Sequence, residues 1–189
     1  ASIPSPEPAP SARTAHPFPK ESSMKIALAG DLHIDGSKKA TCERVLRAMY
    51  ADMVARGADA IIIPGDVYDA LPSPLAQLFL RELVASVPPD VKQLYMPGNH
   101  DAEHVLGVVD AFGGRSVFAG ESVTVMETPR AVDLEVADHV LRVACLPDLR
   151  ATWIKKRLAT MPKGTTALDV ALGVLDDLAA RMEDFAGPT

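Results

Sequence analysis

The sequence has few cysteines and no long apolar stretch. Its 189 residues include only Cys42 and Cys145, and no CxxC motif, so the sequence predicts neither a disulfide framework nor a structural zinc knuckle. No apolar run approaches the length that crosses a membrane, and the first residues lack the apolar core of a secretion signal. We therefore expect a cytoplasmic protein with no membrane partner.

Basic residues are also in short supply. The 19 Lys and Arg are outnumbered by 25 Asp and Glu, which gives a net charge of −6 and argues against a generally basic nucleic-acid-binding protein. A local phosphate site remains compatible with this charge, because bound divalent metals reverse the sign of the field around them. The 48% hydrophobic content is enough for one domain with a core.

Large apolar side chains are nearly absent from residues 1–23, which hold six prolines among serines and alanines. Such a segment cannot bury enough surface to offset the entropy lost on ordering. We predict a disordered, proline-rich tail over residues 1–23 and a single domain over residues 24–189.

Short apolar strands and amphipathic helices alternate from Met24 onward. Strands are expected at Lys25–Ala29, Ala60–Ile63 and Val91–Met96. Helices are expected from a Thr41 cap to Gly57, and from Pro74 to Pro88. This βαβαβ order predicts an α/β fold with a parallel sheet, whose ligands bind at the carboxyl ends of the strands.

The later part of the sequence has a different pattern. Four short strands are expected at residues 116–119, 123–127, 131–136 and 140–146, which is consistent with a second sheet. A final helix is expected from Thr165 to about Phe185. Its predicted buried stripe consists of Leu168, Leu172, Leu175, Ala179, Met182 and Phe185.

Three short polar motifs each follow one of the first three expected strands. They are DLH at residues 31–33, GDVYD at residues 65–69 and GNHD at residues 98–101. Carboxylate, imidazole and amide oxygen are the ligands that hold Mn²⁺, Fe²⁺ or Zn²⁺, and two such ions can bind one phosphoryl group between them. The motifs therefore predict a metal site for phosphate-ester hydrolysis.

In order and spacing, these motifs resemble the DxH, GDxxD and GNH motifs of the calcineurin-like metallophosphoesterases. The resemblance covers about Met24 to Leu149. The stretches GDVYDALPSP and YMPGNHD are similar to the nuclease subunit of the bacterial SbcCD exonuclease. The resemblance implies an αββα fold, a two-sheet sandwich flanked by helices. It also implies hydrolysis of DNA phosphodiesters by two-metal activation of water, with an SbcC-like ATPase as partner.

The resemblance also implies a role for each polar residue of the motifs. Asp31, His33, Asp66 and Asn99 would bind two divalent ions, for which we expect Mn²⁺, with Fe or Zn as alternatives. Asp31 and His33 would also project to the same side of an extended segment. His100 would stabilise charge on the phosphate or protonate the leaving oxygen, and Asp69 would orient it. We expect Asp101 to bind backbone or to support the ligands.

Other interpretations stay open. Taken alone, DLH could be a turn or a helix cap, Gly-Asp a turn, and Gly-Asn a left-handed turn. The later histidine motifs of the family, an isolated His and a GHxH, do not occur in the sequence. We therefore expect a domain that is incomplete at its C-terminus and nearly inactive as given. Alternative functions are a generic phosphatase, a nucleotide phosphodiesterase, or a fragment that binds metal or nucleic acid without turnover.

A basic stretch follows the last expected strand. Its members are Arg150, Lys155, Lys156, Arg157 and Lys163, with Trp153 among them. The charges could contact a nucleic-acid backbone, and Trp153 could stack on a base. We favour the simpler interpretation, a solvated helix face with Trp153 packed inward.

Overall fold

The computed structural model describes residues 23–34, 39–101, 122–136 and 138–185. Residues 1–22 of the predicted tail and the strand expected at 116–119 lie outside these ranges. Four parallel strands form the main sheet in the order β1-β2-β3-β4. They are β1 (Ile26–Leu28), β2 (Ala60–Ile63), β3 (Lys92–Tyr95) and β4 (Val123–Val125). The predicted parallel βαβαβ arrangement is therefore confirmed.

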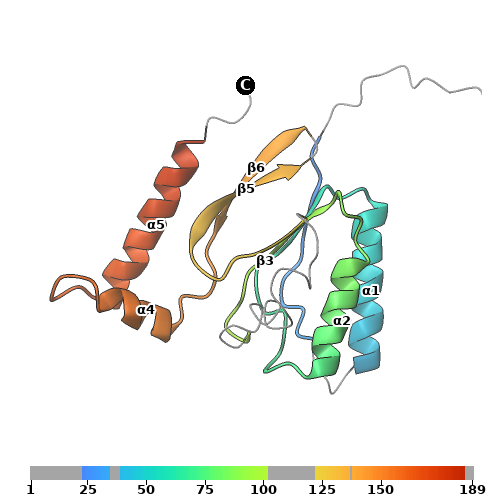
Figure 1. The fold of residues 1–189 in the computed structure, drawn as a ribbon, viewed down its shortest axis with the longest axis horizontal. Coiled ribbons are helices and arrows are strands. Elements are labelled where there is room, and N and C mark those ends of the chain that lie inside the picture. Colours follow the sequence, from blue (N-terminus) through green and yellow to red (C-terminus); the bar gives the residue numbers. More distant parts are fainter. Residues whose placement is uncertain (1–22, 35–38, 102–121, 137, 186–189) are drawn as a thin grey trace, which may run out of the picture.

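Helices α1 (Lys39–Ala55) and α2 (Pro74–Ala85) cover one face of this sheet (Figure 1). The side chain of Ser73 caps α2 by accepting a hydrogen bond from the Ala76 N–H, and Pro74 occupies the first turn. The predicted Thr41 cap of α1 is wrong, because the helix begins two residues earlier, at Lys39. Gly57 follows the end of α1 with a φ of 72°, a conformation that glycine adopts without steric cost.

A chain of hydrogen bonds runs through the core between the sheet and these two helices. The hydroxyls of Tyr50 and Tyr95 lie 2.9 Å apart, and the Tyr95 hydroxyl donates to Gln93 Oε1 over 3.0 Å. Gln93 Nε2 donates in turn to the Val84 carbonyl over 3.2 Å. Burial raises the pKa of Tyr50 to about 12, so its hydroxyl stays protonated beyond the pH at which an exposed tyrosine ionises. The chain thus links α1, β3 and α2 through satisfied polar groups.

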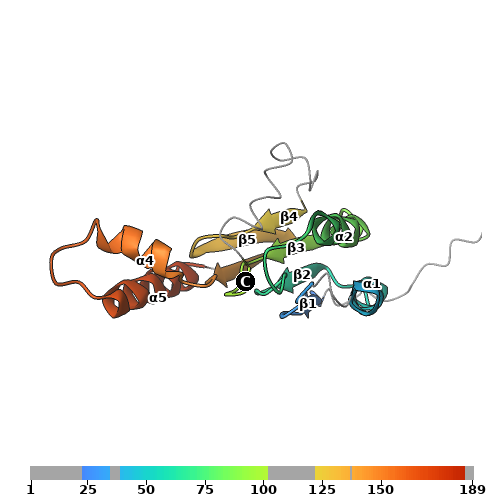
Figure 2. The same ribbon diagram turned by 90° about the horizontal axis from the view of Figure 1, so that it is seen from below.

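A second sheet lies on the opposite face of the first (Figure 2). It is the antiparallel pair β5 (Arg130–Val136) and β6 (His139–Cys145). The core between the two sheets combines Ile62, Leu94 and Met96 with apolar residues of the antiparallel pair, which are Leu134, Val136 and Cys145. The order of layers is helices, parallel sheet, antiparallel sheet and helix, and the predicted αββα fold is confirmed. No helix among the described residues is long and apolar enough to span a membrane.

The outer helix on the second sheet is α5 (Ala167–Glu183), which follows the short helix α4 (Ala151–Leu158). A reciprocal pair of hydrogen bonds between Thr166 and Asp169 caps its first turn. Its buried residues are Val170, Val174 and Leu178.

The predicted buried stripe of α5 is wrong. Leu168, Leu172, Leu175 and Met182 are 66%, 49%, 47% and 38% exposed. The sequence of α5 carries apolar residues on two faces, so its periodicity satisfies either choice. The antiparallel sheet packs against the face with the smaller valines, where Arg142 also binds the Arg181 carbonyl at the end of the helix.

The buried polar chain gives a first prediction. Tyr50→Phe removes one hydrogen bond while keeping the ring, so we expect a loss of about 1 kcal/mol in the free energy of unfolding. Gln93→Leu removes two hydrogen bonds and should cost more than Tyr50→Phe. Urea unfolding of both variants measures the difference. A Gln93→Leu protein as stable as the wild type would contradict a structural role for the chain.

Candidate metal centre

The first two motifs run side by side beyond the ends of β1 and β2. The Asp31 N–H donates to the Gly65 carbonyl over 3.3 Å, and the His33 N–H donates to the Asp66 carbonyl over 3.0 Å. The next residue, Ile34, continues the pairing with a hydrogen bond of 2.9 Å to the Val67 carbonyl. These bonds extend the parallel pairing past the regular strands, which places the DLH segment directly beside the GDVYD segment.

Three of the predicted metal ligands have an unusual backbone conformation. Asp31, His33 and Asp66 have φ values of 54°, 43° and 49°. Among the described residues, they are the only non-glycine residues with positive φ. Such conformations are strained for most side chains, cost roughly 1–3 kcal/mol each and cluster at functional sites. The assumption that Asp31 and His33 lie in an extended segment is therefore wrong, although both still contribute to one ligand cluster.

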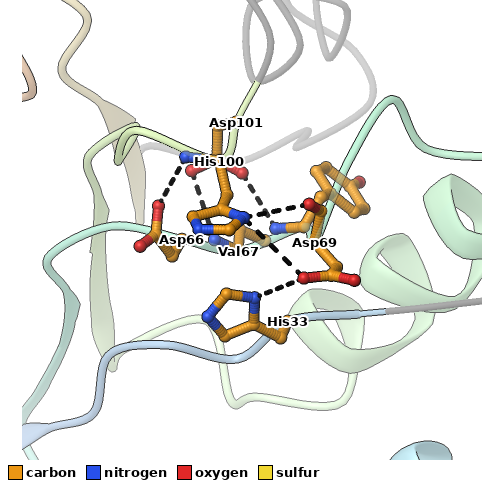
Figure 3. Close-up of polar contacts among 7 residues, drawn as sticks. His33, Asp66, Val67, Asp69, His100 and Asp101 are labelled. Carbon is orange, nitrogen blue, oxygen red and sulfur yellow. Dashed lines mark hydrogen bonds and ion pairs between the residues drawn. The ribbon is translucent and has the colours of Figure 1, made fainter.

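The third motif is held by the carboxylate of Asp101, which is fully buried. Figure 3 shows its contacts with the second motif. Its Oδ1 accepts a hydrogen bond of 2.8 Å from the Tyr68 N–H, and its Oδ2 accepts one of 3.2 Å from the Val67 N–H. The Gly98 N–H also donates to Oδ2, over 2.9 Å. Asp101 thus binds backbone, one of the two arrangements expected from the sequence, and joins the GNHD loop to the GDVYD loop.

Two glycines allow these loops to approach each other. An added Cβ on Gly98 would collide with the carboxylate and the backbone nitrogen of Asp66. A Cβ on Gly65, which has a φ of 125°, would lie 3.1 Å from the Cα of Gly98. The Asp66 carboxylate also accepts a 2.9 Å hydrogen bond from the His100 N–H. Only glycine at position 98 therefore fits beside Asp66 as it is placed here.

The side chains of Asp31, His33 and Asp66 form a cluster that could hold a metal ion, with potential ligand atoms within 4.8 Å of one another. Nδ1 of His33 lies 3.0 Å from Asp69 Oδ1 (Figure 3). Because an ionised carboxylate can only accept, the hydrogen sits on Nδ1 and the lone pair remains on Nε2. Metal-binding histidines typically have this arrangement. The donor set of two carboxylates and one imidazole therefore fits a divalent ion such as Mn²⁺, Fe²⁺ or Zn²⁺.

His100 lies next to this cluster and shares Asp69 with His33. The two imidazole rings meet edge to face, with their centroids 4.9 Å apart. Nδ1 of His100 lies 3.1 Å from the backbone carbonyl of Asp69 and 3.7 Å from its carboxylate. The backbone of Asp69 thus provides the hydrogen bond that orients His100, while its carboxylate hydrogen-bonds to His33. Sequence reasoning paired Asp69 with His100 and missed the bond to His33.

Two further residues show what the sequence did and did not reveal. Asn99 is exposed and lies between Gly98 and His100, both of which contact Asp66. Its predicted role as a ligand stays a prediction. Arg150 donates to the Gly98 carbonyl over 2.9 Å, so it supports the GNHD loop and does not belong to a solvated helix face. Nothing in the sequence pattern relates two residues that are 52 positions apart.

The rest of the basic stretch follows the simpler interpretation. Lys155, Lys156 and Arg157 are exposed on α4, and Lys163 is exposed beyond it. The guanidinium of Arg157 lies 5.6 Å from the ring centre of the partly buried Trp153. The charges therefore lie on a solvated face, as expected.

Comparison with known proteins agrees with this geometry. The family model of the calcineurin-like phosphoesterases matches residues 24–164. This chain belongs to the calcineurin-like phosphoesterase family. The cluster of Asp31, His33 and Asp66 is suited to the divalent metal that the family uses.

One solved structure similar to this chain is the nuclease MPE of Pseudomonas putida. The sequence identity is 19% and the TM-score is 0.39, over 57% of this chain and 50% of the nuclease. This chain therefore spans about half the length of that protein. No curated protein matches the chain at a significant level.

The glycine contact predicts a loss of metal binding on a small substitution. Gly98→Ala should displace the Asp66 carboxylate and weaken Mn²⁺ binding by at least about tenfold. Gly173→Ala is the matched control, because no atom lies within 4 Å of an added Cβ there. In the interior of α5 it should raise the stability by roughly 0.5–1 kcal/mol. Calorimetric titration with Mn²⁺ and thermal melts measure both effects. Unchanged Mn²⁺ affinity in Gly98→Ala would contradict the view that the close approach of Gly98 places the Asp66 carboxylate for metal binding.

The buried carboxylate predicts a loss of stability. Asp101→Asn keeps the shape of the side chain but replaces one acceptor oxygen by an N–H group that faces backbone donors. We expect a loss of roughly 1–3 kcal/mol in the free energy of unfolding. Asp90→Asn, at an exposed carboxylate before β3, should have almost no effect. Denaturant unfolding distinguishes the two, and equal stability of both variants would show that the three hydrogen bonds to Asp101 contribute little.

Proposed function

We propose that the protein hydrolyses phosphodiester bonds of DNA as an exonuclease of the SbcD type. The reaction would use two divalent metal ions, for which we propose Mn²⁺. The observation that carries the proposal is the cluster of Asp31, His33 and Asp66, three residues in left-handed conformations at the end of a parallel sheet. The sequence similarity of GDVYDALPSP and YMPGNHD to the SbcCD nuclease subunit supports the choice of substrate. An SbcC-like ATPase is the proposed partner.

Some residues of the site would bind the metal, and His100 would stabilise charge on the substrate. Asp31, His33 and Asp66 would hold the metal, with Asn99 completing the ligand set. Bound divalent ions would supply Lewis acidity, which neutralises the phosphate and activates water. Asp69 fixes the hydrogen of His33 on Nδ1 and so leaves Nε2 for the metal.

His100 would act on the substrate itself. Its side chain is 44% exposed, so a phosphate at the metal site can reach it. The carbonyl of Asp69 binds its Nδ1, and the carboxylate at 3.7 Å balances the charge of a protonated imidazole. From this position Nε2 can stabilise the developing charge or give a proton to the leaving oxygen.

The test combines metal binding with cleavage. Asp66→Asn is the sharpest variant, because Asn tolerates the left-handed backbone and still accepts a hydrogen bond from the His100 N–H. It removes only the negative charge that a metal needs. We expect Mn²⁺ affinity to fall at least about tenfold, and the low Mn²⁺-dependent hydrolysis of linear DNA that we expect of this chain to fall with it. Asp90→Asn, which also removes one exposed carboxylate, should match the wild type in both measurements.

Three outcomes would change the proposal. Equal Mn²⁺ affinity in Asp66→Asn and the wild type would remove Asp66 from the ligand set. Hydrolysis of p-nitrophenyl phosphate without cleavage of DNA would favour a generic phosphatase over a nuclease. Binding of Mn²⁺ with no hydrolysis of either substrate would leave the alternative of a metal-binding protein without turnover.

A further inference from the structure

A cavity of about 410 Å³ opens beside the metal centre. It is lined by Leu32, by one face of the first turns of α1, and by two residues of the site, His33 and Asp69. The α1 residues are Thr41, Cys42, Val45 and Leu46. Because His33 belongs to the cluster of potential metal ligands and Asp69 hydrogen-bonds to it, the cavity lies directly beside the place where a phosphate would bind.

The lining away from the metal centre is uncharged and mostly apolar. Leu32 and Leu46, which are 8% and 5% exposed, are buried, while Val45 is 54% exposed. Thr41 and Cys42 are the residues with polar side-chain groups that α1 contributes to the lining. A charged ligand group would lose its hydration here without gaining an opposite charge. A neutral ring would gain from leaving water and could use the hydroxyl for one hydrogen bond.

We propose that this cavity is a specificity pocket, which binds an uncharged ring of the substrate, such as a nucleobase, next to the phosphate at the metal centre. The proposal rests on the proposed phosphodiesterase function and names the part of the substrate that this chain would recognise. The volume lies in the range typical of small-molecule sites and is ample for one base. A base can enter only when it is unstacked, so the pocket selects single-stranded or frayed ends.

Two phosphodiesters with the same leaving group test the pocket through kinetics. In the presence of Mn²⁺, p-nitrophenyl phenyl phosphate should have a KM at least about tenfold lower than methyl p-nitrophenyl phosphate, because only the first carries a second ring besides the p-nitrophenyl leaving group that both share. Val45→Glu places a charge at the exposed side of the pocket and should bring the ratio of kcat/KM for the two esters close to one. Taking the ratio cancels any general effect of the charge on an anionic substrate.

The matched control makes the same change elsewhere. Val140→Glu adds a carboxylate at a β6 position that is 39% exposed and does not line the cavity. It should keep the wild-type ratio of the two esters. The proposal would be overturned if the wild-type ratio of kcat/KM for the two esters were close to one. It would also be overturned if Val45→Glu and Val140→Glu changed that ratio equally.

Alkylation of Cys42 provides a readout that needs no turnover. Cys42 lines the cavity, whereas Cys145 is fully buried and its pKa is raised by burial to about 11. Iodoacetamide should therefore label Cys42 much faster than Cys145 in the native protein. Phenyl phosphate with Mn²⁺ should slow labelling of Cys42 severalfold, and methyl phosphate should not. Peptide mass spectrometry follows both cysteines in one sample.

The two readouts separate failure of the pocket from failure of the function. Hydrolysis of neither ester would count against the phosphodiesterase function. The protection of Cys42 from alkylation would then be the measurement that decides whether the pocket binds a ring. Protection by phenyl phosphate and not by methyl phosphate supports it. Equal labelling with both compounds, or a Cys42 that does not react at all, overturns it.

Discussion

Three backbone N–H groups from two loops converge on one buried carboxylate, that of Asp101. A carboxylate without exposure to water is costly unless hydrogen bonds replace its hydration, and here the donors come from Val67, Tyr68 and Gly98. The bonds determine where the GDVYD and GNHD loops lie relative to each other. Asp66 directly precedes Val67 and His100 directly precedes Asp101, so these three hydrogen bonds also help to hold Asp66 and His100 in place.

The site stores strain that the surrounding sheets must hold. Three non-glycine residues have left-handed backbones at the carboxyl end of the sheet, where their conformation brings carboxylates and imidazole together. Two cores, one on each face of the parallel sheet, fix the strands that lead into these loops. Strain of this kind persists only where the neighbouring structure is rigid. The rigid sheet and the strained loops therefore act together to hold the carboxylates of Asp31 and Asp66 close to each other.

Much of the fold could be predicted from the sequence because its signals are local. A four-residue apolar run at 60–63 has no good alternative to a buried strand, and Ser73-Pro74 specifies the start of a helix through capping and a fixed φ. The predictions of where α1 begins and of which face of α5 is buried were wrong, because the local signals there are ambiguous. Several residues could cap α1, and α5 has two apolar faces, so the local pattern did not decide between them.

By itself, the sequence determined that three polar motifs follow three parallel strands, and therefore that their residues meet at one edge of the sheet. Only the tertiary structure decided how they meet. Asp69 hydrogen-bonds to His33, which lies 36 positions away. Gly98 contacts Asp66, 32 positions away, and accepts a hydrogen bond from Arg150, 52 positions away. Such contacts depend on loop conformation and on distances of a few ångströms. Periodicity and propensity describe near neighbours along the chain and carry no information at that range.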